Sequence, residues 1–140
     1  MAGQFQVIDN DSKTGIKVTA PTIDEFFTVC AHGLKLVALG GGSFGQGVAE
    51  VKDLDIKAQT PEELLGKFLN ETVAWLKNGR FVHDRMTLKV ADDMLSLTAK
   101  ASGLTYPALP LQLEVKTTLW QNLKIKKAFG RYAATVNFEV

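Results

Sequence analysis

The segment from Thr22 to Ala38, TIDEFFTVCAHGLKLVA, decides the fold class, because its apolar residues recur with the period of a helix. It opens with a capping box, in which the Thr22 hydroxyl accepts a hydrogen bond from the first turn and Glu25 reaches back to the cap. The apolar stripe comprises Ile23, Phe26, Phe27, Cys30, Leu34 and Val37. A second capping box at Thr60–Glu63 predicts another amphipathic helix, which ends at Asn78-Gly79.

The rest of the chain alternates apolar and polar residues with the period of half-buried antiparallel strands. We expect strands over residues 4–8, 15–20, 48–57, 86–90, 95–101, 111–115 and 132–140, with hairpin turns at Asp92-Asp93 and at 128–130. We expect a loop over residues 102–110. Two amphipathic helices packed on one mostly antiparallel, multi-stranded sheet make an α+β two-layer fold. With 140 residues and no internal repeat, a single domain over 1–140 is predicted.

The composition excludes several classes of protein. Sixteen Lys and Arg against fifteen Asp and Glu give a net charge of +1, so no global field attracts nucleic acid, DNA included, or an anionic membrane surface. No apolar run approaches the roughly 20 residues of a membrane span, and the N-terminus lacks the pattern of a secretory signal. The single cysteine cannot form an internal disulfide, and no Cys/His spacing matches a zinc site. We therefore expect a cytoplasmic protein.

The residues that usually carry catalysis are poorly placed. Cys30 lies on the apolar stripe of the first helix, and His32 lies on a different face of it. We expect His83 in a strand, exposed or singly hydrogen-bonded. The run Gly40–Gly45 has the letters of a dinucleotide loop, but a helix precedes it and a strand follows it, which is the reverse of the required order. An independent enzyme is therefore not predicted.

Two charged clusters remain open to more than one interpretation. The C-terminal hairpin carries four cations, with Lys116 and Trp120 close by in sequence: Lys124, Lys126, Lys127 and Arg131. This strip is typical either of a contact with RNA or an acidic protein face, or of a solvated edge strand protected against aggregation. If the first and last strands are neighbours, Asp11, Glu139 and the terminal carboxylate of Val140 would form an oxygen-rich pocket for a hard cation.

Several stretches in a fixed order resemble the archease family over nearly the whole chain. They are Phe5-x-x-Ile8-Asp9, Gly15-Ile16, residues 22–27, Glu63-Leu64-Leu65 followed by residues 68–71, and the C-terminal pieces 114–116, 123–125 and 135–140. The resemblance implies an SHS2-type fold and a protein cofactor rather than an enzyme. Archeases activate the RNA-splicing ligase of tRNA processing, and a chaperone-like role towards an RNA methyltransferase has been proposed. Family members hold a divalent cation between an N-terminal aspartate, a near-terminal aspartate and the C-terminal carboxylate.

The chain departs from the archease pattern at the functional positions. Lys13 replaces the N-terminal metal-binding aspartate, and Glu139 replaces the near-terminal one. The Lys-x-x-Thr-Tyr-His stretch of the family keeps Lys116 but becomes Leu119, Trp120 and Gln121. An ammonium at position 13 acts as an internal counter-ion, which predicts a lost or very weak metal site.

One route to a surviving site remains. Asp11 lies two residues before Lys13, so in an extended strand both would point to one face. If Lys13 swings aside, Asp11 would supply the missing carboxylate for calcium or manganese.

The resemblance and these departures lead to two alternative functions. The first is an archease-like protein cofactor that binds a protein partner, an RNA-splicing ligase, and meets RNA only indirectly. Asp11, Lys13, Glu139 and Val140 would be its ancestral site, with Lys116, Trp120 and Gln121 as the rim. The alternative is an archease fold put to a new use, as an interaction or small-ligand module without metal or ligase.

Overall fold

Two long helices, α1 (Ile23–Leu39) and α2 (Pro61–Lys77), lie at the centre of the molecule. The structure, a computed structural model, describes residues 3–10, 13–40, 45–119 and 123–139. The strands are β1 (Gln4–Asn10), β2 (Lys13–Ala20), β3 (Val48–Lys57), β4 (Phe81–Val90), β5 (Ser96–Thr105), β6 (Thr117–Leu119), β7 (Lys126–Ala128) and β8 (Arg131–Glu139). Among the described helices, none is both long and apolar enough to cross a membrane.

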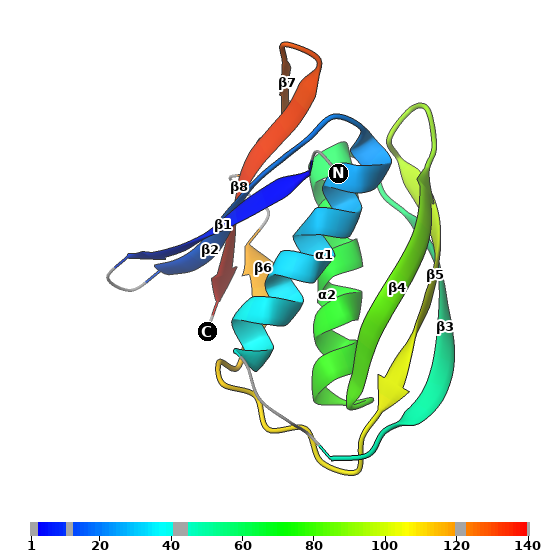
Figure 1. The fold of residues 1–140 in the computed structure, drawn as a ribbon. Helices are drawn as coiled ribbons and strands as arrows, with labels where there is room; N and C mark the ends of the chain where they lie inside the picture. Colours follow the sequence, from blue (N-terminus) through cyan, green and yellow to red (C-terminus); the bar gives the residue numbers. More distant parts are fainter. Residues whose placement is uncertain (1–2, 11–12, 41–44, 120–122, 140) are drawn as a thin grey trace.

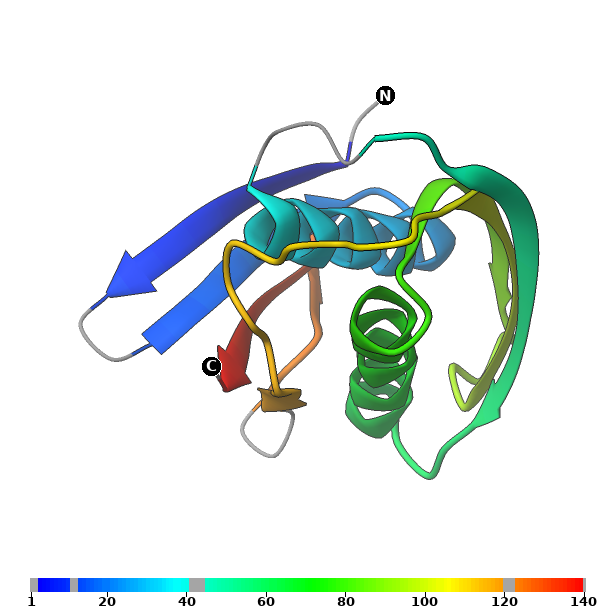
Figure 2. The ribbon, with the colours of Figure 1, turned by 90° about the horizontal axis from the view of Figure 1, so that it is seen from below.

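The strands form two sheets, and the helices lie between them (Figures 1 and 2). The first sheet has the order β1-β2-β8-β6, with β7 also paired to β8, and the second has the order β3-β5-β4. Every recorded pairing is antiparallel. The α+β class and the antiparallel strands are confirmed, whereas the expectation of a single sheet in two layers is wrong. The reason is the width of the buried face of α1, which includes Val29, Ala31 and Gly33 in addition to the predicted stripe, so the helix packs against strands of both sheets.

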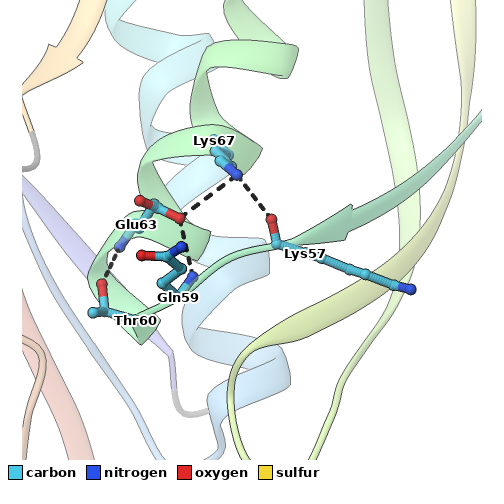
Figure 3. Close-up of polar contacts among 5 residues, drawn as sticks. All are labelled: Lys57, Gln59, Thr60, Glu63 and Lys67. Atoms are coloured by element: carbon cyan, nitrogen blue, oxygen red, sulfur yellow. Dashed lines mark hydrogen bonds and ion pairs between the residues drawn. The ribbon is translucent and has the colours of Figure 1, made fainter.

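Both helix predictions are confirmed, with Thr22 and Thr60 as the N-caps. The complete capping box is present only at α2, because among the described residues no hydrogen bond joins the Glu25 carboxylate to the cap of α1. The Thr22 and Thr60 hydroxyls accept hydrogen bonds from the backbone N–H groups of Glu25 and Glu63, at 3.2 and 3.0 Å. At α2 the Glu63 carboxylate accepts from the backbone N–H of Gln59, one residue before the cap, at 3.0 Å (Figure 3). These bonds satisfy N–H groups that a helix start otherwise leaves unpaired.

The backbone of edge strand β4 is held by side chains of α1. Asp24 accepts a hydrogen bond from the backbone N–H of Val90 at 2.8 Å, and Lys35 donates to the backbone carbonyl of His83 at 2.8 Å. The two side chains are 11 residues apart, about three helical turns, and therefore lie on one side of α1. They form hydrogen bonds with a backbone N–H and a backbone carbonyl that an edge strand would otherwise leave unpaired, and they fix the second sheet against the helix.

The predicted strand at 111–115 is wrong, as is part of the predicted loop at 102–110. The backbone N–H groups of Gln112 and Leu113 donate to the carbonyl of Ala38, at 2.8 and 3.1 Å, so this segment closes the end of α1 instead of joining a sheet. Residues 102–105 continue β5, because they pair with both β3 and β4. The alternation of apolar residues in 111–115 is therefore local packing against the helix end. The other predicted strands and both predicted hairpins are present.

Strand β8 lies in the middle of the first sheet, between β2 and β6. It pairs with β2 and not with β1, which lies on the far side of β2. Gly15 of β2 is opposite Asn137, and a Cβ there would lie 2.4 Å from the carbonyl oxygen of Val136. Only glycine permits this close approach, so Gly15 fixes how β2 and β8 pair.

Candidate functional site

The pairing of β2 with β8 brings positions 13 and 139 to the same end of the first sheet. Thr14 is opposite Phe138, so Lys13 and Glu139 are the next residues along the two antiparallel strands. On the other side of β8, Thr117 is opposite Glu139, and the backbone N–H of Lys116 donates to the carbonyl of Glu139 at 2.7 Å. Three of the predicted site positions, 13, 116 and 139, are therefore adjacent in the backbone.

The other predicted site residues, Asp11, Trp120, Gln121 and Val140, lie outside the described residues. Asn10, the last residue of β1, pairs with Lys13, the first residue of β2. The prediction that Asp11 shares a face with Lys13 depends on Asp11 and stays a prediction.

The described residues of this region do not match the needs of a divalent cation. Hard cations bind six to eight oxygen ligands, several of them carboxylates. At the end of β8 the exposed Glu139 lies between position 13 of β2 and the exposed Lys116. Over the described residues no group of three His, Cys, Asp or Glu side chains is arranged to hold a metal ion.

Asn70 of α2 positions the strand beside Glu139, and sequence reasoning missed this role. Its amide oxygen accepts from the backbone N–H of Thr118 at 2.8 Å and from the Thr117 hydroxyl at 3.1 Å. These two bonds attach the short strand β6 to the helix, and β6 in turn pairs with the end of β8. The available signal was an asparagine inside an otherwise regular helix, where its side chain is favoured only if it finds a specific partner.

His83 is buried, which corrects the expectation of an exposed or singly hydrogen-bonded imidazole. Its exposed fraction is 6%, and its ring lies edge-on to Trp75 at a centroid distance of 6.3 Å. Burial, together with the nearby positive charge of Lys35 and the neighbouring His32, lowers the pKa of His83 to about 4. The imidazole is therefore neutral at pH 7. The strand is bulged at Asp84, and a hollow of about 550 Å³ lies beside it.

The prediction of Cys30 as a packed core residue is confirmed. Its side chain is fully buried, and burial raises the pKa of the thiol far above its ordinary value. A thiol that stays protonated is not a nucleophile. Among the described residues, neither histidine is in a recorded hydrogen bond with this thiol or with a carboxylate.

The basic strip of the C-terminal hairpin lies partly on the outer face of the first sheet. Lys124 and Lys126, with Lys17 of β2, line a groove of about 410 Å³. Lys127 instead lies over the ring of Tyr132, 5.2 Å from its centroid. Lys116 lies at the other end of β8, next to Glu139, so it does not belong to this groove.

We predict that Asn70→Leu destabilises the protein by about 1–3 kcal/mol, because the backbone N–H of Thr118 loses its acceptor in a partly buried place. Urea denaturation followed by circular dichroism measures the change. Asn70→Asp is the matched control, since it keeps an oxygen at the same position. Equal stability of the leucine variant and the wild type would show that Asn70 does not hold β6.

We predict that the free energy of unfolding falls as the pH is lowered from about 6.5 to about 4, with a contribution from His83 of at most about 1.4 kcal/mol per pH unit. In this window the unfolded chain takes up a proton at position 83 and the folded protein does not, so stability is full above 6.5 and is lost towards 4. Urea titrations of the wild type and of His83→Phe at several pH values isolate the effect. Parallel pH profiles for the two proteins would contradict it.

Comparison with known proteins agrees with this architecture. The solution structure of Methanobacterium thermoautotrophicum protein 1598 is similar with a TM-score of 0.73 and 16% identity, over 97% of this chain and 98% of that one. The crystal structure of an archease, described as a possible chaperone, from Thermotoga maritima is similar with a TM-score of 0.61 and 12% identity, over 95% and 94%.

At these identities the likeness establishes the fold, and the family is established by sequence. No curated protein matches the chain. Residues 5–140, nearly the full length, match the Archease protein family (MTH1598/TM1083). The chain therefore belongs to the archease family.

Proposed function

We propose that this protein is an archease-type accessory protein that binds an RNA-splicing ligase and promotes its guanylation and repeated turnover. The observation that carries the proposal is the convergence of positions 13, 116 and 139 at one end of the first sheet. These are the positions at which the family resemblance places its functional residues, and they come from three separate segments of the chain. Family membership over residues 5–140 supports the same role.

The chemistry of the described residues favours an accessory role over catalysis. Covalent catalysis needs a nucleophile with a base in hydrogen-bond reach. Cys30 is sealed in the core, and His83 is neutral and in contact with Trp75 and Lys35. His32 is exposed on α1, where its ring meets Phe5. This supports a protein that acts by contact with a partner enzyme.

At the end of β8 we propose that Lys13 takes the electrostatic place of the cation that other archeases bind. A fixed ammonium beside the Glu139 carboxylate would offset its negative charge without a metal. Lys116, Trp120 and Gln121 would then form the rim that meets the ligase. On this proposal the activator needs no divalent cation of its own.

A second candidate function is an interaction module on the same fold that no longer acts on the ligase. The observation that favours it is the change of residue type at the family's functional positions, where Lys13, Trp120 and Gln121 stand. The scaffold residues that resemble the family persist beside these changes. The two candidates differ in one property, which is stimulation of the ligase.

Multiple-turnover RNA ligation by the ligase of the same genome, with and without this protein, separates the two candidates. We predict stimulation by the wild type and a loss of stimulation in Lys116→Glu, because Lys116 borders Glu139 at the proposed contact. Lys100→Glu, an equal change of charge on the exposed side of β5, is the control and should still stimulate. A ligase that turns over equally well without this protein would favour the second candidate.

We predict that Lys13→Asp creates a calcium or manganese site. It removes a positive charge and adds a carboxylate next to position 139. Metal at about 100 times its dissociation constant would stabilise the variant by about 2.7 kcal/mol. Thermal melts with metal and with chelator measure the shift, and the wild type should show none. Identical melts of the variant with metal and with chelator would show that positions 13 and 139 do not form a cation site.

A further inference from the structure

The outer face of the first sheet is polar and cationic. In β2 and β8 alternate residues point to the helices, among them Ile16 and Val136, which are fully buried. The residues between them point away, and Lys17 lies directly opposite Thr135 in the pairing of the two strands. Lys126 of β7 lies opposite Ala133 of β8 and extends the same face. The groove of about 410 Å³ described above lies on this face.

Three lysines line this groove, and no carboxylate of a described residue does. Lys17, Lys124 and Lys126 are exposed, and within the described ranges none of them is in a recorded ion pair. The floor between them consists of small or hydrogen-bonding residues, including Ala133, Thr135 and Asn137. The groove thus concentrates positive charge although the whole chain carries only +1.

Phe129 stands at the tip of the hairpin formed by β7 and β8, which projects from the rest of the molecule (Figure 1). Its side chain is fully exposed, and its backbone has a φ of +53°. A bulky residue rarely adopts this conformation, and asparagine or glycine is the usual choice at such a turn. Neither burial nor turn geometry accounts for a phenylalanine here. An exposed aromatic ring held in a disfavoured conformation points to a role in binding.

The chemistry of the groove fits a nucleic acid better than a protein surface. Stable protein interfaces have a core of large apolar and aromatic side chains, and none lines the described part of this groove. Lysine, threonine and asparagine are residue types that contact phosphates and sugars. An aromatic ring beside a cationic groove is the arrangement with which proteins bind single strands, because any base can stack on it. Three residues of extended strand, about 10 Å, separate Lys126 from Phe129.

We propose that this face binds single-stranded RNA. Lys17, Lys124 and Lys126 hold successive phosphates along the groove, and Phe129 stacks on a base at the tip of the hairpin. The Thr135 hydroxyl and the Asn137 amide provide hydrogen bonds for a 2′-hydroxyl, the group that distinguishes RNA from DNA. The groove reaches Asn137, two residues before Glu139, so it adjoins the end of β8 proposed to meet the ligase and gives the protein a direct contact with RNA.

Fluorescence anisotropy with a labelled, unstructured RNA of about 12 nucleotides tests the proposal. Three phosphate contacts predict a dissociation constant that rises roughly twentyfold between about 50 mM and about 200 mM salt. Lys17→Glu and Lys126→Glu should each weaken binding at least about tenfold, whereas Lys100→Glu on the other sheet should change it less than about twofold. Thermal melts verify that each variant is folded. The same sequence as single-stranded DNA should bind more weakly.

Phe129 provides a second, independent test. Phe129→Asn should weaken RNA binding about fivefold or more, while Phe129→Tyr should keep it. Because asparagine tolerates a positive φ, Phe129→Asn should also raise the melting temperature. If the variant binds RNA more weakly but melts at a higher temperature, unfolding cannot explain the weaker binding.

Several results would overturn the proposal. They are the absence of RNA binding at about 50 mM salt, equal losses in Lys17→Glu and Lys100→Glu, unchanged binding in Phe129→Asn, or equal affinity for DNA. Binding of the purified ligase that needs these lysines, without affinity for RNA, would assign the face to a protein partner instead.

Discussion

The close pairing of β2 with β8 is the constraint on which the rest of the structure depends. Gly15 allows the two strands to approach, and the pairing places the C-terminal strand in the middle of the first sheet. One end of this pair brings Lys13 beside Glu139, and its outer face forms the floor of the cationic groove. Both proposed sites therefore depend on one register, and a shift by one residue would turn every side chain of β8 to the opposite face.

Much of the fold follows from local signals in the sequence. Both helices, their threonine N-caps and the hairpin turns follow from the sequence, because each depends on residues close together in the chain. The split into two sheets was not, because it depends on which strands pair over long distances. The segment 111–115 shows the same limit: its alternating residues are those of a strand, but its backbone bonds to Ala38 at the end of α1.

The candidate site was predictable in part, through the family resemblance rather than through spacing. The resemblance named positions 13, 116 and 139, and the register brings them together. Asn70, which holds β6 to the helix, lies in a stretch that resembles the family, but neither the resemblance nor its residue type indicated its partners in β6. The burial of His83 was also hidden in the sequence, since a bulge after it changes the alternation of β4 and Lys35 comes from another element to cover its backbone.

Hydrogen–deuterium exchange of this protein, free and bound to the ligase of the same genome, tests the central claim most directly. We expect ligase binding to slow exchange in the segments that meet at the end of β8, around Thr14, Thr117 and Phe138, and to leave the β4–β5 hairpin unchanged. Protection of β4 and β5 with none at the end of β8 would contradict the account, because it would place the partner on the opposite sheet.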